Sequence, residues 1–275
     1  SPCPVGAGGG KVSGEEAGAA GGGITKIPSV VEKKEYSVSP SSIKAEIVIE
    51  KSAAEKLNIK NTGDASLDFS LDVIGVKDFV SLSEHSFSLN AGESKTITAE
   101  IYGKDFGAYS GNIVIKAGGI EKIVPVVIEV KSELVLFDVK LDIPSQYKEI
   151  KKGSDLKAQI TLLNVGKQKK VDVYATYLIK DFSGDVIYES SETFAVDEQK
   201  SFAKIFPLPK NIPLGDYLAV VELRYGNSFA VSSETFKVVE VTPQKLFKTP
   251  SYILAIMVIL LIGVLFLFVS RLMPK

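Results

Sequence analysis

An uninterrupted apolar stretch near the end of the chain constrains the architecture more than any other feature. Residues 252–269 read YILAIMVILLIGVLFLFV and contain no charged side chain. A bilayer core of about 30 Å needs roughly 20 apolar residues in a helix. A buried core helix is the alternative, but a core helix of a soluble domain keeps a polar face, which this stretch lacks. The sequence therefore predicts one transmembrane helix over residues 252–270. The residues assigned to this membrane anchor are Tyr252, Ile253, Leu254, Ile256, Leu260, Leu261, Leu265, Phe266, Phe268 and Arg271.

The two ends of the chain differ from its middle in composition. Residues 1–23 are rich in Gly and Ala and lack an apolar period, which predicts a flexible tether. Residues 242–251 contain a proline near each end and form a juxtamembrane stem, and residues 271–275 form a short basic tail. The first residue is Ser rather than Met, which suggests that a signal peptide has been removed.

Length and composition bound the middle of the chain. The 275 residues leave room for two domains of about 100 residues each between tether and stem. The formal net charge is −1, so no overall field favours nucleic acid as a partner. The single cysteine, Cys3, allows no intrachain disulfide and is interpreted as a free thiol, with lipidation as the alternative. Each domain must therefore be stabilised by its apolar core.

Alternation of apolar and polar residues dominates this middle part. Residues 67–73 read LDFSLDV, so Leu67, Phe69, Leu71 and Val73 are predicted to face inward. Many such short segments, separated by Gly- and Asn-containing turns, are typical of antiparallel β-sandwiches. Pro125 predicts an edge strand or a bulge. We expect an all-β fold with two tandem immunoglobulin-like antiparallel β-sandwiches, over residues 24–131 and 134–241, followed by the C-terminal transmembrane α-helix.

The two predicted sandwiches share three sequence matches in the same order. LNIKNTG at residues 57–63 parallels TLLNVG at 161–166, and AGESK at 91–95 parallels VDEQK at 196–200. GAY at 107–109 parallels GDY at 215–217, which places a tyrosine at the start of a late strand in both. We expect each tyrosine hydroxyl to bond back to the preceding loop, as in a tyrosine corner.

These motifs carry a resemblance to known families. The first unit, with its NTGD turn, its DFVSLS and FSLNAGESKTI runs and its GAYSGNIVI strand, resembles immunoglobulin-like domains of the ASH/MSP/NEW3 type. The second unit, with KKGSDLKAQITLLNVGK and IPLGDYLAVVEL, resembles CARDB-like or NEW3-like modules. The resemblance covers residues 36–240 and implies membrane-anchored cell-surface proteins of archaea or bacteria. It implies a fold and no active site.

The chain offers little that carries catalysis or metal binding. His85 is the only histidine and is interpreted as a solvated loop residue, since no oriented acid accompanies it. Calcium is the metal left open, through scattered carboxylates. We expect no cofactor, no metal site and no enzyme activity. The carboxylates considered are Asp64, Asp68, Asp72, Asp138, Asp142 and Asp155, and the small basic groups are Lys148, Lys151 and Lys152, with Lys167, Lys169 and Lys170.

The leading hypothesis is a non-enzymatic, single-pass cell-surface protein used for adhesion, scaffolding or assembly with envelope proteins. An accessory subunit of a larger membrane complex and a tail-anchored cytosolic MSP-like adaptor that binds peptide motifs are the alternatives. Flanking positive charges are balanced, and we expect the domains outside the membrane and the short tail in the cytoplasm. The joint at residues 131–133 is short, which predicts a semi-rigid rod with the second sandwich nearer the membrane.

Overall fold

The computed structural model describes residues 32–134, 136–166, 170–240 and 259–264. Within them the chain forms two antiparallel β-sandwiches, so the all-β expectation is confirmed. The tether at residues 1–23, the stem and the basic tail lie outside the described residues, as do residues 24–31 of the first predicted domain.

The first sandwich holds strands β1 to β9. One sheet has the order β1-β3-β7-β5 and the other β2-β9-β8-β4-β6, with β2 parallel to β9. The strands are β1 (Tyr36–Ser39), β2 (Ile43–Val48), β3 (Ser52–Asn61), β4 (Leu67–Ile74), β5 (Val80–Leu82), β6 (Ser86–Leu89), β7 (Ser94–Tyr102), β8 (Gly107–Ala117) and β9 (Ile120–Lys131).

The second sandwich repeats this plan with strands β10 to β17. Its sheets have the orders β10-β12-β15 and β11-β17-β16-β13-β14, with β11 parallel to β17. The elements are β10 (Phe137–Asp142), a 3-10 turn η1 (Ser145–Tyr147), β11 (Glu149–Lys151), β12 (Leu156–Asn164), β13 (Val171–Asp181), β14 (Val186–Val196), β15 (Gln199–Phe206), β16 (Gly215–Tyr225) and β17 (Ser228–Val239).

Strand β4 illustrates why the alternating sequence folds in this way. Its burial alternates without a fault, and all four apolar residues predicted to face inward are buried. Phe69 packs edge-on against Tyr36 at 5.2 Å between ring centroids and stacks on Phe87 at 5.1 Å. A strand with one apolar face gains free energy by burying that face, and a one-residue slip would expose it.

The asparagine turns have the same hydrogen bonds in both sandwiches. The Gly63 N–H donates to Asn61 Oδ1 at 3.0 Å, and the Gly166 N–H donates to Asn164 Oδ1 at the same distance. The backbone N–H of each asparagine donates to a glutamate carbonyl in the facing loop, at 2.9 Å in both sandwiches. An asparagine side chain that bonds two residues ahead stabilises a turn locally.

The predicted tyrosine corners are present in both sandwiches. Tyr109 donates its hydroxyl hydrogen to the Phe106 carbonyl at 3.0 Å, and Tyr217 donates to the Pro213 carbonyl at 2.9 Å. Each bond ties the start of a late strand to the loop before it. In both sandwiches the hydroxyl bonds a backbone carbonyl three or four residues earlier, as expected for a structural repeat.

Pro125 lies in a strand that has neighbours on both sides, which differs from a simple edge position. Pairing of β9 with β2 begins at Val126, opposite Ile43. The Lys131 carbonyl accepts a hydrogen bond from the Ile49 N–H, so the backbone of Lys131 faces β2. Backbone groups of alternate residues point the same way, so the backbone nitrogen of Pro125 also faces the β2 side. Because β2 pairs only beyond Pro125, the missing N–H removes no ladder bond.

Candidate interaction surface between the two sandwiches

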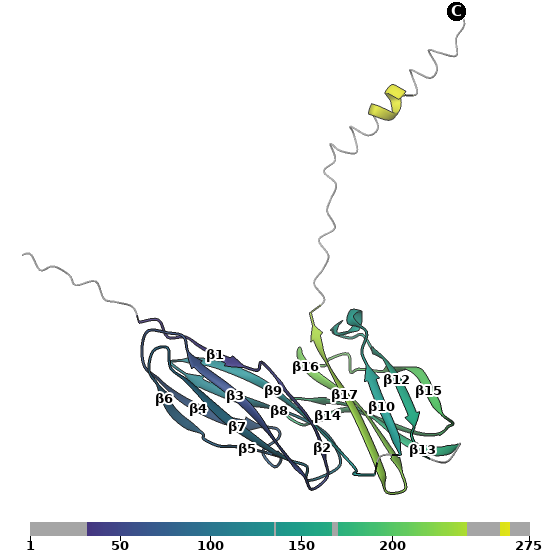
Figure 1. Ribbon diagram of the computed structural model, residues 1–275. Coiled ribbons are helices and arrows are strands. Elements are labelled where there is room, and N and C mark those ends of the chain that lie inside the picture. Colours follow the sequence, from purple (N-terminus) through teal and green to yellow (C-terminus); the bar gives the residue numbers. More distant parts are fainter. Residues whose placement is uncertain (1–31, 135, 167–169, 241–258, 265–275) are drawn as a thin grey trace, which may run out of the picture.

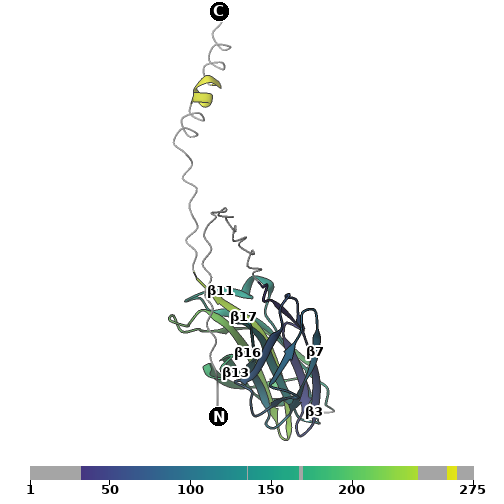
Figure 2. The ribbon, with the colours of Figure 1, turned by 90° about the vertical axis from the view of Figure 1, so that its left-hand side faces the viewer.

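The two sandwiches pack against each other through the outer faces of two sheets. Strands β8 and β9 of the first sandwich lie against β13, β16 and β17 of the second (Figures 1 and 2). Phe106 stacks on Phe229 at 5.0 Å between centroids. The modules thus meet along their sheets, an arrangement that differs from the rod with a distal first sandwich expected from the short joint. The buried residues of this inter-domain face are Ala108, Val127, Leu178, Leu218, Val220, Phe229 and Val231.

Sequence reasoning missed this face, although a signal for it was present. Residues 126–130 of β9 and residues 217–223 of β16 are buried without interruption. An alternating strand has one buried face, whereas a continuous apolar run indicates burial on both. The stretches VPVVIEV and YLAVVEL thus differ from LDFSLDV in the way that a covered outer face requires.

A buried carboxylate joins the two domains beside this apolar face. Glu129 of β9 has a side chain that is only 4% exposed. Its Oε1 accepts hydrogen bonds from the Ser233 N–H and hydroxyl of β17, both at 2.6 Å. Lys44 of β2 lies 3.0 Å from the same oxygen and also donates to the Ser233 carbonyl at 2.9 Å. A buried charge that is paired and hydrogen-bonded in this way favours one relative position of the two domains.

A second set of polar contacts lies where β8 begins. Lys180 donates to the Ala108 carbonyl at 2.7 Å, and the Ala108 N–H donates to Glu222. Burial raises the pKa of Glu222 and lowers the pKa of Lys180, while each charge partly offsets the shift of the other. Burial, followed by the nearby Asp105 carboxylate, raises the pKa of Tyr109 to about 12. These shifts are those of groups held in an apolar interface.

The hairpin between β13 and β14 contacts the first sandwich. Ser110 donates to the Asp181 carbonyl at 2.7 Å, and Asn112 donates to the Phe182 carbonyl at 3.4 Å. Gly75 has a φ of +80°, and a Cβ there would lie 3.0 Å from the Phe182 oxygen. Only glycine therefore fits this approach without strain.

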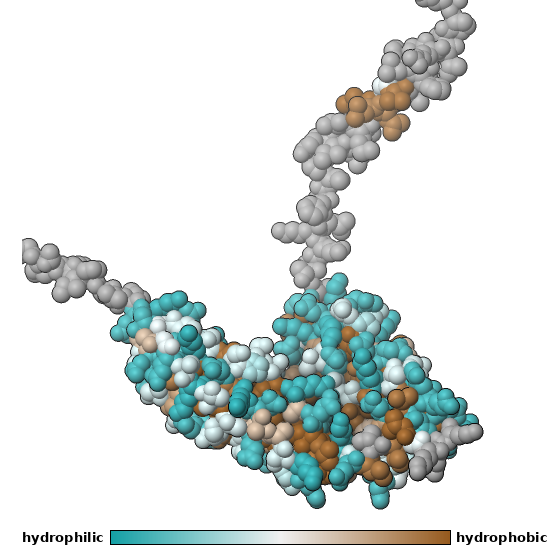
Figure 3. Space-filling view, in the orientation of Figure 1, coloured by the Kyte–Doolittle hydropathy of each residue, from teal (hydrophilic) through white to brown (hydrophobic). Residues whose placement is uncertain are grey.

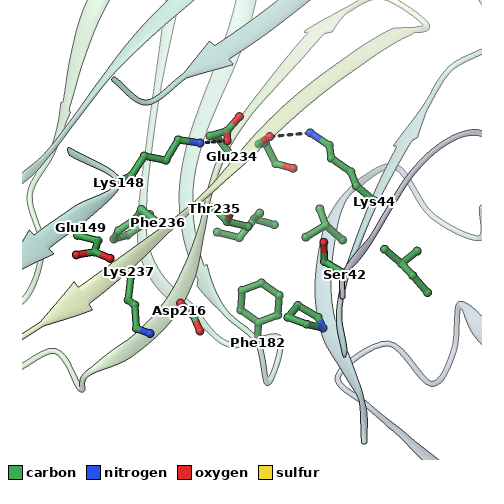
Figure 4. A pocket seen from close by; sticks show the side chains of 15 residues that line it. Ser42, Lys44, Lys148, Glu149, Phe182, Asp216, Glu234, Thr235, Phe236 and Lys237 are labelled. Atoms are coloured by element: carbon green, nitrogen blue, oxygen red, sulfur yellow. Dashed lines mark hydrogen bonds and ion pairs between the residues drawn. The ribbon is translucent and has the colours of Figure 1, made fainter. Parts of the chain in front are cut away.

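Beside these contacts the two domains leave a groove of about 500 Å³ (Figure 4). Ser42 and Lys44 line its first-domain wall, and Phe182 of the second domain also lines it. On the other wall Lys148 pairs with Glu234. The hydropathy surface in Figure 3 shows apolar residues at the junction of the two domains as well as polar ones.

Comparisons with known proteins give similarity of fold alone. No protein-family model matches the sequence, and no characterised protein matches it. A protein of unknown function from Porphyromonas gingivalis W83 is 15% identical, with 74% of this chain and 97% of that chain covered and a TM-score of 0.41. The ASH/PapD-like domain of human CEP192 is 12% identical, with 45% and 99% covered and a TM-score of 0.33.

A third solved structure is the CsuC-CsuE chaperone-tip adhesion subunit pre-assembly complex of Acinetobacter baumannii. It is 9% identical to this chain, with 61% of this chain and 89% of that chain covered and a TM-score of 0.29. All three structures have a sequence identity of 15% or less and a TM-score below 0.5, so they assign this chain no partner or activity.

The residues considered for chemistry do not converge. In the described ranges no three His, Cys, Asp or Glu side chains lie together in an arrangement that could hold a metal ion. His85 Nδ1 lies 3.2 Å from the Leu71 carbonyl. Asp68 accepts a hydrogen bond from the Ser88 hydroxyl, and Asp72 pairs with Lys77 at 3.3 Å. These contacts stabilise loops and strand surfaces locally.

Most of the predicted membrane anchor lies outside the described residues. Leu260 and Leu261 are described, within a helical segment at residues 259–264. No helix in the described ranges has both the length and the apolar character that crossing a bilayer requires. The anchor residues outside those ranges are Tyr252, Ile253, Leu254, Ile256, Leu265, Phe266, Phe268 and Arg271.

Proposed function

We propose that this chain is a non-enzymatic, single-pass membrane protein whose two packed sandwiches act as one unit in adhesion or scaffolding. The observation that carries the proposal is the buried inter-domain face, with Glu129 held by Ser233 and Lys44. An apolar interface with paired charges at fixed positions holds the modules in one orientation. A unit of fixed shape presents its strand edges to a partner without a loss of inter-domain freedom on binding.

The anchor at residues 252–270 is part of this proposal. Residues 259–264 are helical, and their large apolar residues are 62% to 67% exposed. Apolar side chains left in water at that exposure gain free energy by entering lipid. We place the sandwiches on the extracytoplasmic side and the tail of residues 271–275 in the cytoplasm. The finer resemblance to CARDB-like and NEW3-like modules of archaeal or bacterial envelopes belongs to the same proposal.

Membrane extraction combined with protease protection tests this function. The full chain is expected to stay with membranes through washes at high salt and high pH, whereas a chain ending at Thr249 is released. Protease added to intact cells is expected to remove both sandwiches. Release of the full chain by the washes would contradict the anchor. Survival of the sandwiches until the membrane is broken would favour a tail-anchored cytosolic adaptor.

A further inference from the structure

The free edges of the four sheets differ in length and protection. Strands β1, β5, β6 and β11 are three or four residues long. On β10 the Leu141 N–H is capped by the Ser232 hydroxyl at 3.1 Å. On β15 Lys204 points inward and pairs with Glu192, and Lys200 lies over the Phe194 ring at 4.2 Å. Short strands and inward lysines are ordinary ways to block the addition of another strand.

Strand β14 is longer and less protected: its inward charge is Glu192, which pairs with Lys204, and its one irregularity lies near its start, at Ile187. All of its residues except Ile187, where the register shifts, pair with β13 along one side, and no other strand of the described residues pairs along its second side. It contains neither lysine nor proline. Glu189, Ser191 and Thr193 are exposed on its outer face, and Tyr188 and Phe194 are half-buried on its core face. A long edge with free backbone groups and partly covered aromatic residues is a template for one more strand.

We propose that β14 pairs antiparallel with β14 of a second copy of this chain, about a two-fold axis at Ser191. Ser191 is the midpoint of the strand Val186–Val196, so this register joins the regular part of the strand from Tyr188 to Phe194. On the outer face each Glu189 then lies opposite a Thr193 of the other copy. Glutamates do not face each other there, and a carboxylate opposite a hydroxyl is a favourable cross-strand pair.

The core face fits the same register. Tyr188 of each copy lies opposite Phe194 of the other, which gives two cross-strand aromatic pairs. Ser190 lies opposite Glu192. Moving the axis by one residue to Glu192 would set two like charges against each other, and moving it to Ser190 would set Tyr188 against Glu192. The sequence of β14 is therefore self-complementary about Ser191.

The topology then decides how the two copies are oriented. Strand β14 is antiparallel to β13, β13 to β16, and β16 to β17, so β14 runs opposite to β17. The end of β17 leads toward the proposed anchor. Antiparallel pairing of the two β14 strands reverses β17 in the second copy, so the two anchors leave at opposite ends. The dimer thus joins two facing membranes, a step that rests on the proposed anchor.

Cysteine cross-linking in the full chain tests the pairing. In a Cys3→Ser background, Ser191→Cys places two thiols at the axis, where directly opposite Cα atoms are about 4.5–5.5 Å apart, a separation a disulfide can bridge. Mild oxidation in detergent micelles is expected to give a disulfide-linked dimer. Ser201→Cys, exposed on the β15 edge, is the matched control and should stay monomeric. Dimer at or below the control level would overturn the pairing.

A vesicle experiment tests the orientation. Two populations carry the Ser191→Cys chain with different tags, and after mixing and oxidation the disulfide dimers are expected to contain both tags. Ser191→Lys, which sets two charges at the axis, should abolish vesicle clustering, and Ser201→Lys should leave it unchanged. Dimers with a single tag would overturn the facing-membrane arrangement. Flotation of the chain with vesicles, measured first, reports on the anchor separately, because cross-linking in micelles needs no membrane.

Discussion

At the scale of single residues, Glu129 decides how the sandwiches meet. Glu46 lies beside it in the β2–β9 register but pairs with Lys131 at the surface. Glu129→Ala removes the hydrogen-bond acceptor of the Ser233 N–H and hydroxyl. Because these donors are then left buried without that acceptor, the substitution should lower the free energy of unfolding by about 1–3 kcal/mol. Glu46→Ala should lower it by at most about 1 kcal/mol, since exposed pairs contribute little. Denaturant unfolding of both variants measures this, and equal losses would argue against the buried contact.

At the scale of elements, the register of β4 is the sharpest expectation from the sequence. Phe69→Ala removes a ring that is 2% exposed and should destabilise the protein by about 3–5 kcal/mol. Asp68→Ala, one residue earlier and facing water, should change stability by about 0.5 kcal/mol or less. Thermal or denaturant unfolding distinguishes the two. Similar effects at both positions would mean that the faces of β4 are assigned the wrong way round.

The elements also show what could be predicted from sequence and what could not. Alternation located most strands, as at Leu67 to Val73, because a half-buried strand needs a period of two. The short β11 escaped it, since three residues carry no period. The inter-domain face escaped it too. The sequence of a strand that is apolar on both faces does not tell which segment covers its second face. The hydrogen bond between Ser233 and Glu129 likewise joins residues far apart in the sequence.

At the scale of the whole molecule, the two sandwiches are expected to behave as one body. A distance measurement by pulsed electron paramagnetic resonance tests this directly. Spin labels at Lys60→Cys in the first sandwich and Asp172→Cys in the second, in a Cys3→Ser background, occupy exposed positions. The labelled chain is diluted into unlabelled chain so that each distance is intramolecular. We expect a single narrow distribution of distances, and a broad one, as independent modules on a free linker would give, would contradict the account.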